Sequence, residues 1–334
     1  MSELDDRVRS VADSSGFSGA VRFRRQGVIE LDAAFGFADR AHRIAAETTT
    51  RFATASATKG FTALAVMRLV ELGVLQLSTP VRGLLGDDLR LIDDRVTIEH
   101  LLAHRSGIGD YLDEELLEDA SDYVLTRPAH ELTDTVAFLP MLEGHEQRFE
   151  PGTEFVYNNG GYMVLALVAE RATSRSYHEL VDELVVQPAG LAGTAFLRSD
   201  ELPGDAALGY LYQTGLRTNV FHLPVLGNGD GGIYTTLDDV DAFWSALFGG
   251  RIVSVDTVAD MLTPRSLVDG GAHRYGLGFW LHGSNDTVQL DGADAGVSFR
   301  AAHRPSTGTA FTVLSNWSDG AWPIARLLTP LLDD

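Results

Sequence analysis

The chain has 334 residues, no cysteine and a formal net charge of −21 at pH 7. Such an acidic chain is poorly suited to binding nucleic acid or anionic membranes, and without cysteine it has no disulfide, thiolate nucleophile or cysteine-based metal site. No apolar run is long enough to span a bilayer, and the acidic N-terminus lacks the apolar core of a signal peptide, so we expect a cytoplasmic location.

The N-terminal part of the chain predicts one helix and a β-hairpin. Residues 2–14 have the pattern of a short amphipathic helix. Two strands are expected next, over 18–25 and 28–36, because the Gln26–Gly27 pair between them is typical of a tight hairpin turn.

The middle of the chain predicts mostly helices and long loops. Apolar residues at helical spacing follow Lys59 and stop at Gly73. A short helix and a glycine-containing loop are expected over 97–111, and the acidic stretch 113–122 resembles a solvated helix face. Further helices are expected over 130–142, 161–173, 177–190 and 237–250.

The C-terminal part changes character, because short runs of apolar, β-branched and aromatic residues alternate with turn residues. They predict consecutive antiparallel strands over 275–283, 287–292, 297–305 and 309–317. A closing helix over 321–334, with Pro323 near its start, is expected after them. Strands at both ends and helices between them indicate an α+β protein with one sheet built from both ends of the chain and an inserted helical lobe.

Lys59 is the only lysine: of the 26 lysine and arginine residues, the other 25 are arginines. An arginine keeps its proton at any ordinary pH, whereas a lysine moved out of water can become a neutral amine and act as a base. Ser56 lies three residues earlier, so near the start of a helix the two side chains share one face. The N–H groups and dipole of the first turn would favour an alkoxide on Ser56. The pattern S-x-x-K is short, and a stray surface lysine is the alternative.

A second candidate pair lies on the loop before the apolar helix of 161–173. The hydroxyl of Tyr157 can both accept and donate a proton, and the amide of Asn159 can hold the lysine or a substrate carbonyl. A lone Y-x-N is usually a turn beside a core aromatic. The two motifs in this order are more specific than either one.

With these motifs the chain resembles the serine β-lactamase and D-alanyl-D-alanine carboxypeptidase-like family, on the branch of class C β-lactamases, D-aminopeptidases and related esterases. The matching stretches are RFATASATKGFTALAVMRLVELGVLQL, TIEHLLAHRSGIGDY, FEPGTEFVYNNGGYMVLALVAERAT, GNGDGGIYTTLDDVDAFWSALFGG and YGLGFWL. The resemblance implies that Ser56 is the acylated nucleophile and Lys59 its general base. It also implies that Tyr157 passes the proton to the leaving group and that Asn159 orients the substrate and Lys59.

The resemblance implies a β-lactamase/transpeptidase-like fold, in which an antiparallel sheet flanked by N- and C-terminal helices packs beside an all-helical lobe. We expect the sheet lobe to comprise 1–55 plus 265–334 and the mostly helical lobe 56–264. Together they would form one catalytic unit, with the site in the cleft between them.

The third motif of the family usually reads K-T-G or H-x-G, but here the matching residues are Leu290-Asp291-Gly292. A slipped alignment would bring Gly292-Ala293-Asp294 to the same place, and it is no more basic. β-Lactams and D-alanyl peptides carry a carboxylate, which Asp291 or Asp294 would repel. Arg300 would compensate only if it points into the cleft.

The resemblance implies substrate contacts from this strand and its neighbour, at Leu290, Asp291, Gly292, Gly296 and Ser298. An oxyanion hole would combine the backbone N–H of Ser56 with one near 296–298. No cofactor or metal is implied.

We therefore expect a serine hydrolase that acts through an acyl-enzyme on a small-molecule ester or amide, neutral or cationic on its acyl side, with weak or no β-lactamase activity. A true β-lactamase or D-alanyl-D-alanine carboxypeptidase is one alternative. A non-catalytic penicillin-binding or sensor protein is the alternative from another class.

Three other patterns have less specific readings. His100 and His104 are four residues apart, but two histidines rarely make a metal site, so packing and hydrogen-bonding roles are expected. The glycine-rich segment 227–232 lacks the lysine of a P-loop and predicts a tight turn lining the cleft. The segment 292–296 has the form of a hydrolase elbow, but a strand rather than a helix is expected after it.

Overall fold

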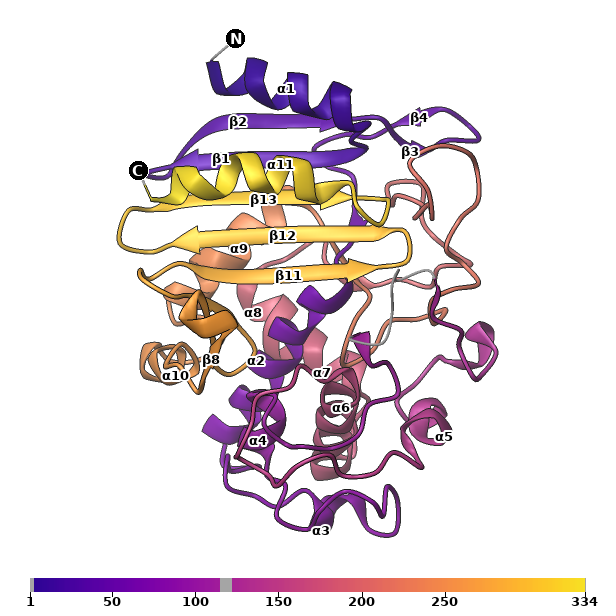
Figure 1. Ribbon diagram of the computed structural model, residues 1–334, viewed down its shortest axis with the longest axis vertical. Helices are drawn as coiled ribbons and strands as arrows, with labels where there is room; N and C mark the ends of the chain where they lie inside the picture. Colours follow the sequence, from indigo (N-terminus) through magenta and orange to yellow (C-terminus); the bar gives the residue numbers. More distant parts are fainter. Residues whose placement is uncertain (1–2, 115–121, 334) are drawn as a thin grey trace.

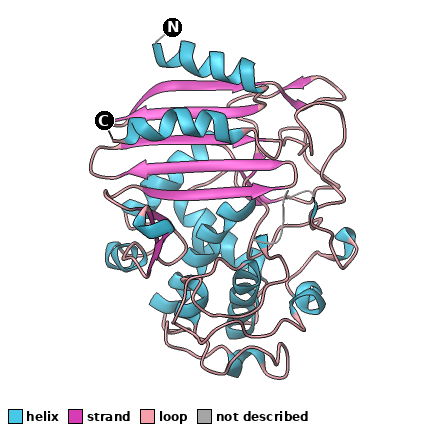
Figure 2. Ribbon diagram, in the orientation of Figure 1, coloured by secondary structure: helices cyan, strands magenta, loops and turns pink. Residues whose placement is uncertain are grey.

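The computed structural model describes residues 3–114 and 122–333, in which an eight-stranded antiparallel sheet packs above a group of helices (Figures 1 and 2). The strand order is β2-β1-β13-β12-β11-β10-β9-β8. Its strands are β1 (Gly19–Arg25), β2 (Val28–Phe35), β8 (Ser266–Val268), β9 (His273–Tyr275), β10 (Trp280–His282), β11 (Val288–Asp294), β12 (Val297–Arg304) and β13 (Thr309–Ser315). Both ends of the chain thus contribute to one sheet, which confirms the predicted α+β architecture.

Helices lie on both faces of this sheet and below it (Figure 1). The helices are α1 (Glu3–Ser15), α2 (Thr58–Glu71), α3 (Arg82–Leu85), α4 (Ile98–Leu102), α5 (Leu139–Leu142), α6 (Asn159–Thr173), α7 (Tyr177–Val181), α8 (Gln187–Ala189), α9 (Leu237–Phe248), α10 (Val255–Met261) and α11 (Ala321–Leu328). The terminal helices α1 and α11 pack together on one face of the sheet, and α9 packs on the other.

Two apolar clusters hold these layers together. The smaller one fills the space between the sheet and the terminal helices, with Phe23 and Phe311 from strands and Ile324 from α11. The larger one is continuous from the other sheet face into the helical region, where it includes Leu64 and Leu165. Because this core crosses the expected boundaries at 55 and 265, the division into two lobes stays a prediction.

Local sequence signals account for several elements. The β1–β2 hairpin turns at Gln26 and Gly27, whose φ angles of 51° and 80° are those of the mirror-image turn that suits twisted strands. The helices expected over 2–14, 161–173 and 237–250 are present as α1, α6 and α9.

Other expectations were wrong in detail. The segment 130–142 forms only two short 3-10 turns and the single-turn helix α5, because Pro140 and the polar residues before it leave no continuous apolar face. The strand expected over 275–283 is divided into β9 and β10 by a turn containing Gly278, which has a φ of 88°. The helix face expected over 113–122 lies mostly outside the described residues.

Two small sheets support the loops around the large one. One pairs β3 (Phe37–Asp39) with β4 (Ile44–Ala45). The other places β7 (Ile233–Thr235) between β5 (Phe52–Ala53) and β6 (Ala195–Phe196). Since β5 ends three residues before Ser56, this second sheet fixes the backbone that leads to the candidate nucleophile.

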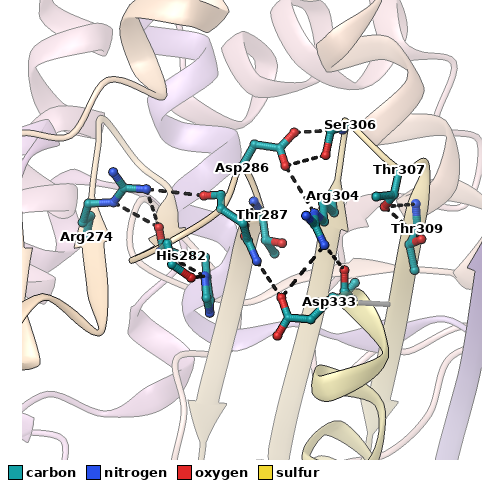
Figure 3. Close-up of polar contacts among 12 residues, drawn as sticks. Arg274, His282, Asp286, Thr287, Arg304, Ser306, Thr307, Thr309 and Asp333 are labelled. Atoms are coloured by element: carbon teal, nitrogen blue, oxygen red, sulfur yellow. Dashed lines mark hydrogen bonds and ion pairs between the residues drawn. The ribbon is translucent and has the colours of Figure 1, made fainter.

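A polar network fastens one end of the sheet to the C-terminal segment (Figure 3). Arg304 at the end of β12 donates to the backbone oxygen of Leu332 at 2.7 Å and lies 3.5 Å from Asp286. The Asp286 carboxylate in turn accepts from Ser306, and Asn285 donates to Asp333. The chain end after α11 is therefore held against the sheet by side chains as well as by packing.

Arg22 joins the sheet to α9 and is only 6% exposed. Its guanidinium donates to Asp32 on β2 and to Asp238 and Asp241 on α9, at 2.6–3.0 Å. Removing one partner of such a buried group leaves the others uncompensated.

We therefore expect Arg22→Met to lower the free energy of unfolding by about 3 kcal/mol in urea titrations. Arg90→Met is the matched control, because Arg90 makes a fully surface-exposed pair with Asp87 and should change stability far less. Equal midpoints for the two variants would contradict the proposed importance of the Arg22 network.

Across residues 3–114 and 122–333, no helix combines the length and apolar character needed to cross a bilayer.

Candidate active site

Ser56 lies in the 3-10 turn η1 (Ala55–Ala57), between β5 and the start of α2. The residue before it, Ala55, has a φ of 46°, which is uncommon for a side chain other than glycine and is typical of strained functional turns. Lys59 follows in the first turn of α2 and is only 2% exposed. The turn and helix therefore bring the two side chains to the same face, as the spacing predicts.

Lys59 makes three polar contacts at its amine. Its Nζ is 2.9 Å from Ser56 Oγ, 2.7 Å from Asn159 Oδ1 and 2.8 Å from the backbone oxygen of Asp230. The oxygens of Asn159 and Asp230 can only accept, so two N–H groups of the amine point toward them. The third contact joins the amine to the Ser56 hydroxyl, so the Lys59 nitrogen is close enough to exchange a proton with it, as a general base must be.

Tyr157 lies on the loop before α6, with its hydroxyl close enough to Ser56 for that side chain to influence its pKa. Its ring centre is 4.9 Å from Lys59 Nζ, and the ring stacks on Trp280 with centroids 6.0 Å apart. Burial, and then the negative charge of Glu114, raises the pKa of Tyr157 well above its ordinary value. The phenol therefore stays protonated at neutral pH, where it can donate a proton but does not act as a phenolate.

His104 packs behind this group, with its ring centroid 4.3 Å from that of Tyr157. Its Nδ1 accepts from the backbone N–H of Asn158 at 3.1 Å. Burial, and then the charge of Lys59, lowers the pKa of His104 well below its ordinary value, so the ring is neutral. His100 instead caps α4 together with Thr97. Both histidines thus have the packing and hydrogen-bonding roles expected from the sequence.

Asn159 begins α6, and the loop around Asp110 clamps it in place. The Asn159 amide donates to the backbone oxygen of Leu112 and to Glu114, at 2.9 and 3.0 Å. The Asp110 carboxylate accepts the free backbone N–H groups of Asn159 and Gly160 at the helix start. Burial raises the pKa of Asp110 to about 6 in spite of these bonds. The amide oxygen of Asn159 is therefore fixed toward Lys59.

A pocket of about 910 Å³, including the open space at its mouth, lies beside these residues. Ser56 and Asn159 line it, together with the 227–232 segment, which confirms that this turn borders the cleft. In the described part of the chain, no group of three or more histidine, aspartate or glutamate side chains could hold a metal ion.

The structure does not bring Leu290 and Asp291 to the pocket, which corrects the role expected from the third motif. Leu290 is buried and contacts α2, where a Cβ added to Gly60 would lie 2.7 Å from its Cδ2. Asp291 points to the opposite face of the sheet and forms a two-point pair with Arg300, both bonds being 2.7 Å. Arg300 lies over the ring of Trp322 in α11 and so faces away from the cleft.

Gly296 and Ser298 also have structural partners instead of facing the pocket. The N–H of Gly296 donates to Ser318 Oγ. The Ser298 hydroxyl donates to the backbone oxygen of Trp317 and accepts the N–H of Ala321, which ties β12 to the start of α11. The Gly296 N–H and the Ser298 hydroxyl are therefore not available as oxyanion donors. The residues of the β11–β12 hairpin that line the pocket are Ala293, Asp294 and Val297.

Gly292 does not line the pocket, yet it determines how closely β11 approaches the nucleophile. A Cβ added to Gly292 would lie 1.9 Å from the backbone oxygen of Thr54 and 3.1 Å from the backbone nitrogen of Ala57. Any side chain at this position would force β11 away from η1. Glycine is required here by this contact between two backbones.

We expect Gly292→Ala to lower kcat/KM by about a hundredfold or more, because a shift of about 1 Å misplaces the reacting groups. Steady-state kinetics on a chromogenic ester would measure it. Gly83→Ala is the control, since a Cβ added at Gly83 meets no atom within 4 Å. Retained activity in Gly292→Ala would show that β11 has no part in positioning the site.

Sequence reasoning missed four contributors to the site. Asp230 accepts the Lys59 amine through a backbone oxygen, for which a sequence carries no signal. Trp280 stacks on Tyr157, and Glu114 and Asp294 line the pocket. Asp230 and Trp280 belong to segments that the sequence analysis singled out, and Asp294 lies in the third motif, where the alternation of the strand could have indicated the face on which it lies.

Comparisons with known proteins identify the family and the fold. A family model described as Beta-lactamase matches residues 4–329. The crystal structure of a penicillin-binding protein from Bacillus halodurans superposes with a TM-score of 0.90, at 34% identity, covering 97% of this chain and 99% of that one.

Two curated relatives are similar at the sequence level. Penicillin-binding protein 4* of Bacillus subtilis is 28% identical over 303 residues, which cover 86% of this chain and 64% of the relative. D-aminopeptidase of Brucella anthropi is 28% identical over 337 residues, which cover 97% of this chain and 61% of the relative. The chain spans slightly less than two thirds of the length of these relatives. The match over nearly its whole length shows that the chain belongs to the beta-lactamase family of serine hydrolases.

Proposed function

We propose that this protein hydrolyses ester or amide bonds through an acyl-enzyme on Ser56, with little or no turnover of β-lactams. The observation that carries the proposal is the position of Lys59 Nζ, 2.9 Å from Ser56 Oγ and held by two further acceptors. An unassisted serine hydroxyl is a poor nucleophile and needs such a base.

Acylation begins when the Lys59 amine takes the proton of the Ser56 hydroxyl and Oγ attacks the substrate carbonyl. The C–O or C–N bond of the substrate then breaks, and the Tyr157 phenol gives its proton to the leaving group. The Lys59 ammonium restores that proton, so both side chains return to their starting states. In deacylation a water molecule attacks the acyl-enzyme carbonyl and the bond to Ser56 Oγ breaks. The proton transfers run in reverse, so the acid is released and Ser56 regains its proton.

The donors for the carbonyl oxygen are the backbone N–H groups of Ser56 and Ala293. The β11–β12 turn has two residues, so the flanking Asp294 and Val297 form a hydrogen-bonded pair. Hydrogen-bonded and non-hydrogen-bonded pairs alternate along antiparallel strands, so the next pair, Ala293 and Ser298, is not hydrogen-bonded. The N–H of Ala293 therefore points away from β12. That edge of β11 faces η1, and both Ala293 and Ser56 line the pocket.

The charge around the site supports esters or amides over β-lactams. A β-lactam carboxylate would meet Asp294, and the Arg300 side chain that could bind it is paired with Asp291 behind the sheet. The similarity to a D-aminopeptidase supports amide substrates as well as esters.

A fluorophosphonate probe and a small substrate panel test the proposal. We expect mass spectrometry to find one adduct, on the peptide that contains Ser56, and no adduct in Ser56→Ala. Phenyl acetate should be turned over, whereas benzylpenicillin should at most acylate the protein slowly. Efficient cephalosporin turnover would favour a true β-lactamase, and labelling without any ester turnover would favour a sensor protein.

A further inference from the structure

The Lys59 amine depends on a backbone oxygen that belongs to a turn and not to a helix or strand. Asp230 supplies this oxygen, 2.8 Å from Lys59 Nζ, from the 227–232 turn before β7. Backbone bonds between Asn228 and Gly231 close the turn, with N···O distances of 2.8 and 3.2 Å. Because a backbone oxygen moves with its peptide plane, the position of the amine depends on what fixes this turn.

Thr62 of α2 holds the turn one peptide unit before Asp230. Its hydroxyl is 2.6 Å from the backbone oxygen of Gly229. Gly229 is buried, and no second donor from residues 3–114 and 122–333 reaches this oxygen. A buried carbonyl without a donor is costly, so the turn would rearrange to find a new partner if the Thr62 hydroxyl were removed.

Tyr177 at the start of α7 determines the direction of the Thr62 hydroxyl. A threonine hydroxyl has one proton and a backbone oxygen only accepts, so that proton goes to Gly229. The Tyr177 hydroxyl, 2.8 Å from Thr62 Oγ1, is therefore the donor to Thr62. Burial raises the pKa of Tyr177, so the phenol keeps its proton. Without this donor the Thr62 hydroxyl is free to turn to the backbone oxygen of Thr58, 3.3 Å away in the same helix.

The same part of α2 also holds the turn that carries the nucleophile. Thr58 donates to the backbone oxygen of Ala55 at 2.7 Å and accepts the N–H of Ile233 at 3.1 Å. Thr58, Lys59 and Thr62 are each at most 2% exposed. Threonine and lysine are mostly exposed in proteins, and buried polar groups are retained where they have partners. The start of α2 thus fastens both the nucleophile turn and the turn that binds the amine.

We propose that Thr62, oriented by Tyr177, is a positioning residue for the general base. Thr62 does not line the pocket. It acts through the turn, whose orientation determines where Asp230 presents its oxygen to Lys59. The inference rests on the proposed function, because it names a further residue on which the reaction at Ser56 depends.

Thr62→Val tests the proposal, because valine keeps the shape of threonine and lacks the hydroxyl. Burst kinetics with p-nitrophenyl acetate give the acylation rate constant at saturation and the ester concentration that produces half of it. We expect the rate constant to fall at least about tenfold and the half-saturating concentration to stay nearly unchanged, because the base is misplaced while the pocket is intact.

Two further variants test the role of the hydroxyl and of its orientation. Thr62→Ser retains the hydroxyl and should keep most of the wild-type acylation rate. Tyr177→Phe leaves the proton on Thr62 but no longer fixes its direction, so we expect a smaller loss than in Thr62→Val. A loss that depended only on packing would instead be larger in Thr62→Ser, which lacks a methyl group that valine keeps.

A double-variant cycle with Lys59 separates positioning from a general structural defect. If Thr62 acts through the amine, Thr62→Val should slow the wild type but not a protein that already carries Lys59→Met. A structural defect would slow both proteins by the same factor. Near-ultraviolet circular dichroism establishes whether each variant is folded.

Thr309→Val is the matched control. Thr309 is 1% exposed, and its hydroxyl accepts from Thr307 at 2.9 Å (Figure 3). It lies at the end of β13 that pairs with Arg304, away from the β11–β12 turn. This variant also loses a buried hydroxyl, and it should lower the unfolding temperature without changing the acylation rate constant.

The two proposals fail in different ways. If folded Thr62→Val acylates as fast as the wild type, or slows the Lys59→Met protein by the same factor, the inference is overturned and the hydrolase remains. If Thr62→Val does not fold, Tyr177→Phe decides, because a wild-type rate there contradicts the role of Thr62 orientation. If the wild type hydrolyses no ester and Ser56 is not labelled, the proposed function itself is wrong.

Discussion

Replacing Lys59 by arginine is expected to lower kcat for ester hydrolysis by about three to four orders of magnitude, close to the effect of Ser56→Ala. Arginine preserves the positive charge but cannot release its proton at neutral pH, so it cannot take the proton of Ser56 Oγ. The effects of substituting groups that act as one unit are not additive. The double variant Ser56→Ala with Lys59→Arg should therefore be no slower than Ser56→Ala alone.

Single-turnover kinetics with a chromogenic ester measure this effect on the acylation step. Arg68→Lys is the control, because Arg68 lies on the same helix in a partly exposed pair with Glu71 and should leave the rate unchanged. Since an arginine is larger than the buried lysine, Lys59→Met with an intact thermal transition serves as a second test. Retention of a tenth or more of the wild-type rate in both folded variants would exclude Lys59 as the base.

The second large effect is expected for Tyr157→Phe, which should lower kcat by about two to three orders of magnitude and leave KM nearly unchanged. The change removes only the hydroxyl near Ser56 and keeps the ring that stacks on Trp280. Folding should be preserved, because the aromatic packing is retained. The decrease in kcat reflects lost proton delivery to the leaving group. Esters whose leaving groups need no proton should therefore show the smallest decrease.

Tyr275→Phe is the matched control for this variant. Tyr275 contacts the same aromatic group, with its ring centroid 4.9 Å from Trp280, but its hydroxyl lies 3.5 Å from that of Tyr162 instead of near Ser56. Its rate should stay within a few-fold of the wild type. Should the two variants behave alike, the relay role would pass from Tyr157 to another group.

Local geometry explains which parts of the site could be predicted from the sequence. Ser56 and Lys59 are three residues apart, and the turn of a helix alone brings them together. Tyr157 lies about a hundred residues later, and only the family resemblance connected it with them. The backbone oxygen of Asp230 belongs to a predicted turn, but its contact with Lys59 depends on the packing of three separate segments.

At the third motif, the family pattern and the alternation of the strand predict different roles for Leu290 and Asp291. Leu290 is apolar and Asp291 is charged, and strict alternation along a strand places the first toward the core and the second on the opposite face. The structure follows that alternation, with Asp291 paired to Arg300. The substrate contacts expected at 290–292 came from the family pattern, whereas the alternation places Asp294 on the same face as Leu290.

The presence of a single lysine has a practical consequence for chemical modification. Amine-acylating reagents have one side-chain target in the whole sequence, and in the folded state that target is enclosed, because Lys59 is only 2% exposed. A mass increment on the peptide containing position 59 would report directly on how often the catalytic amine becomes accessible.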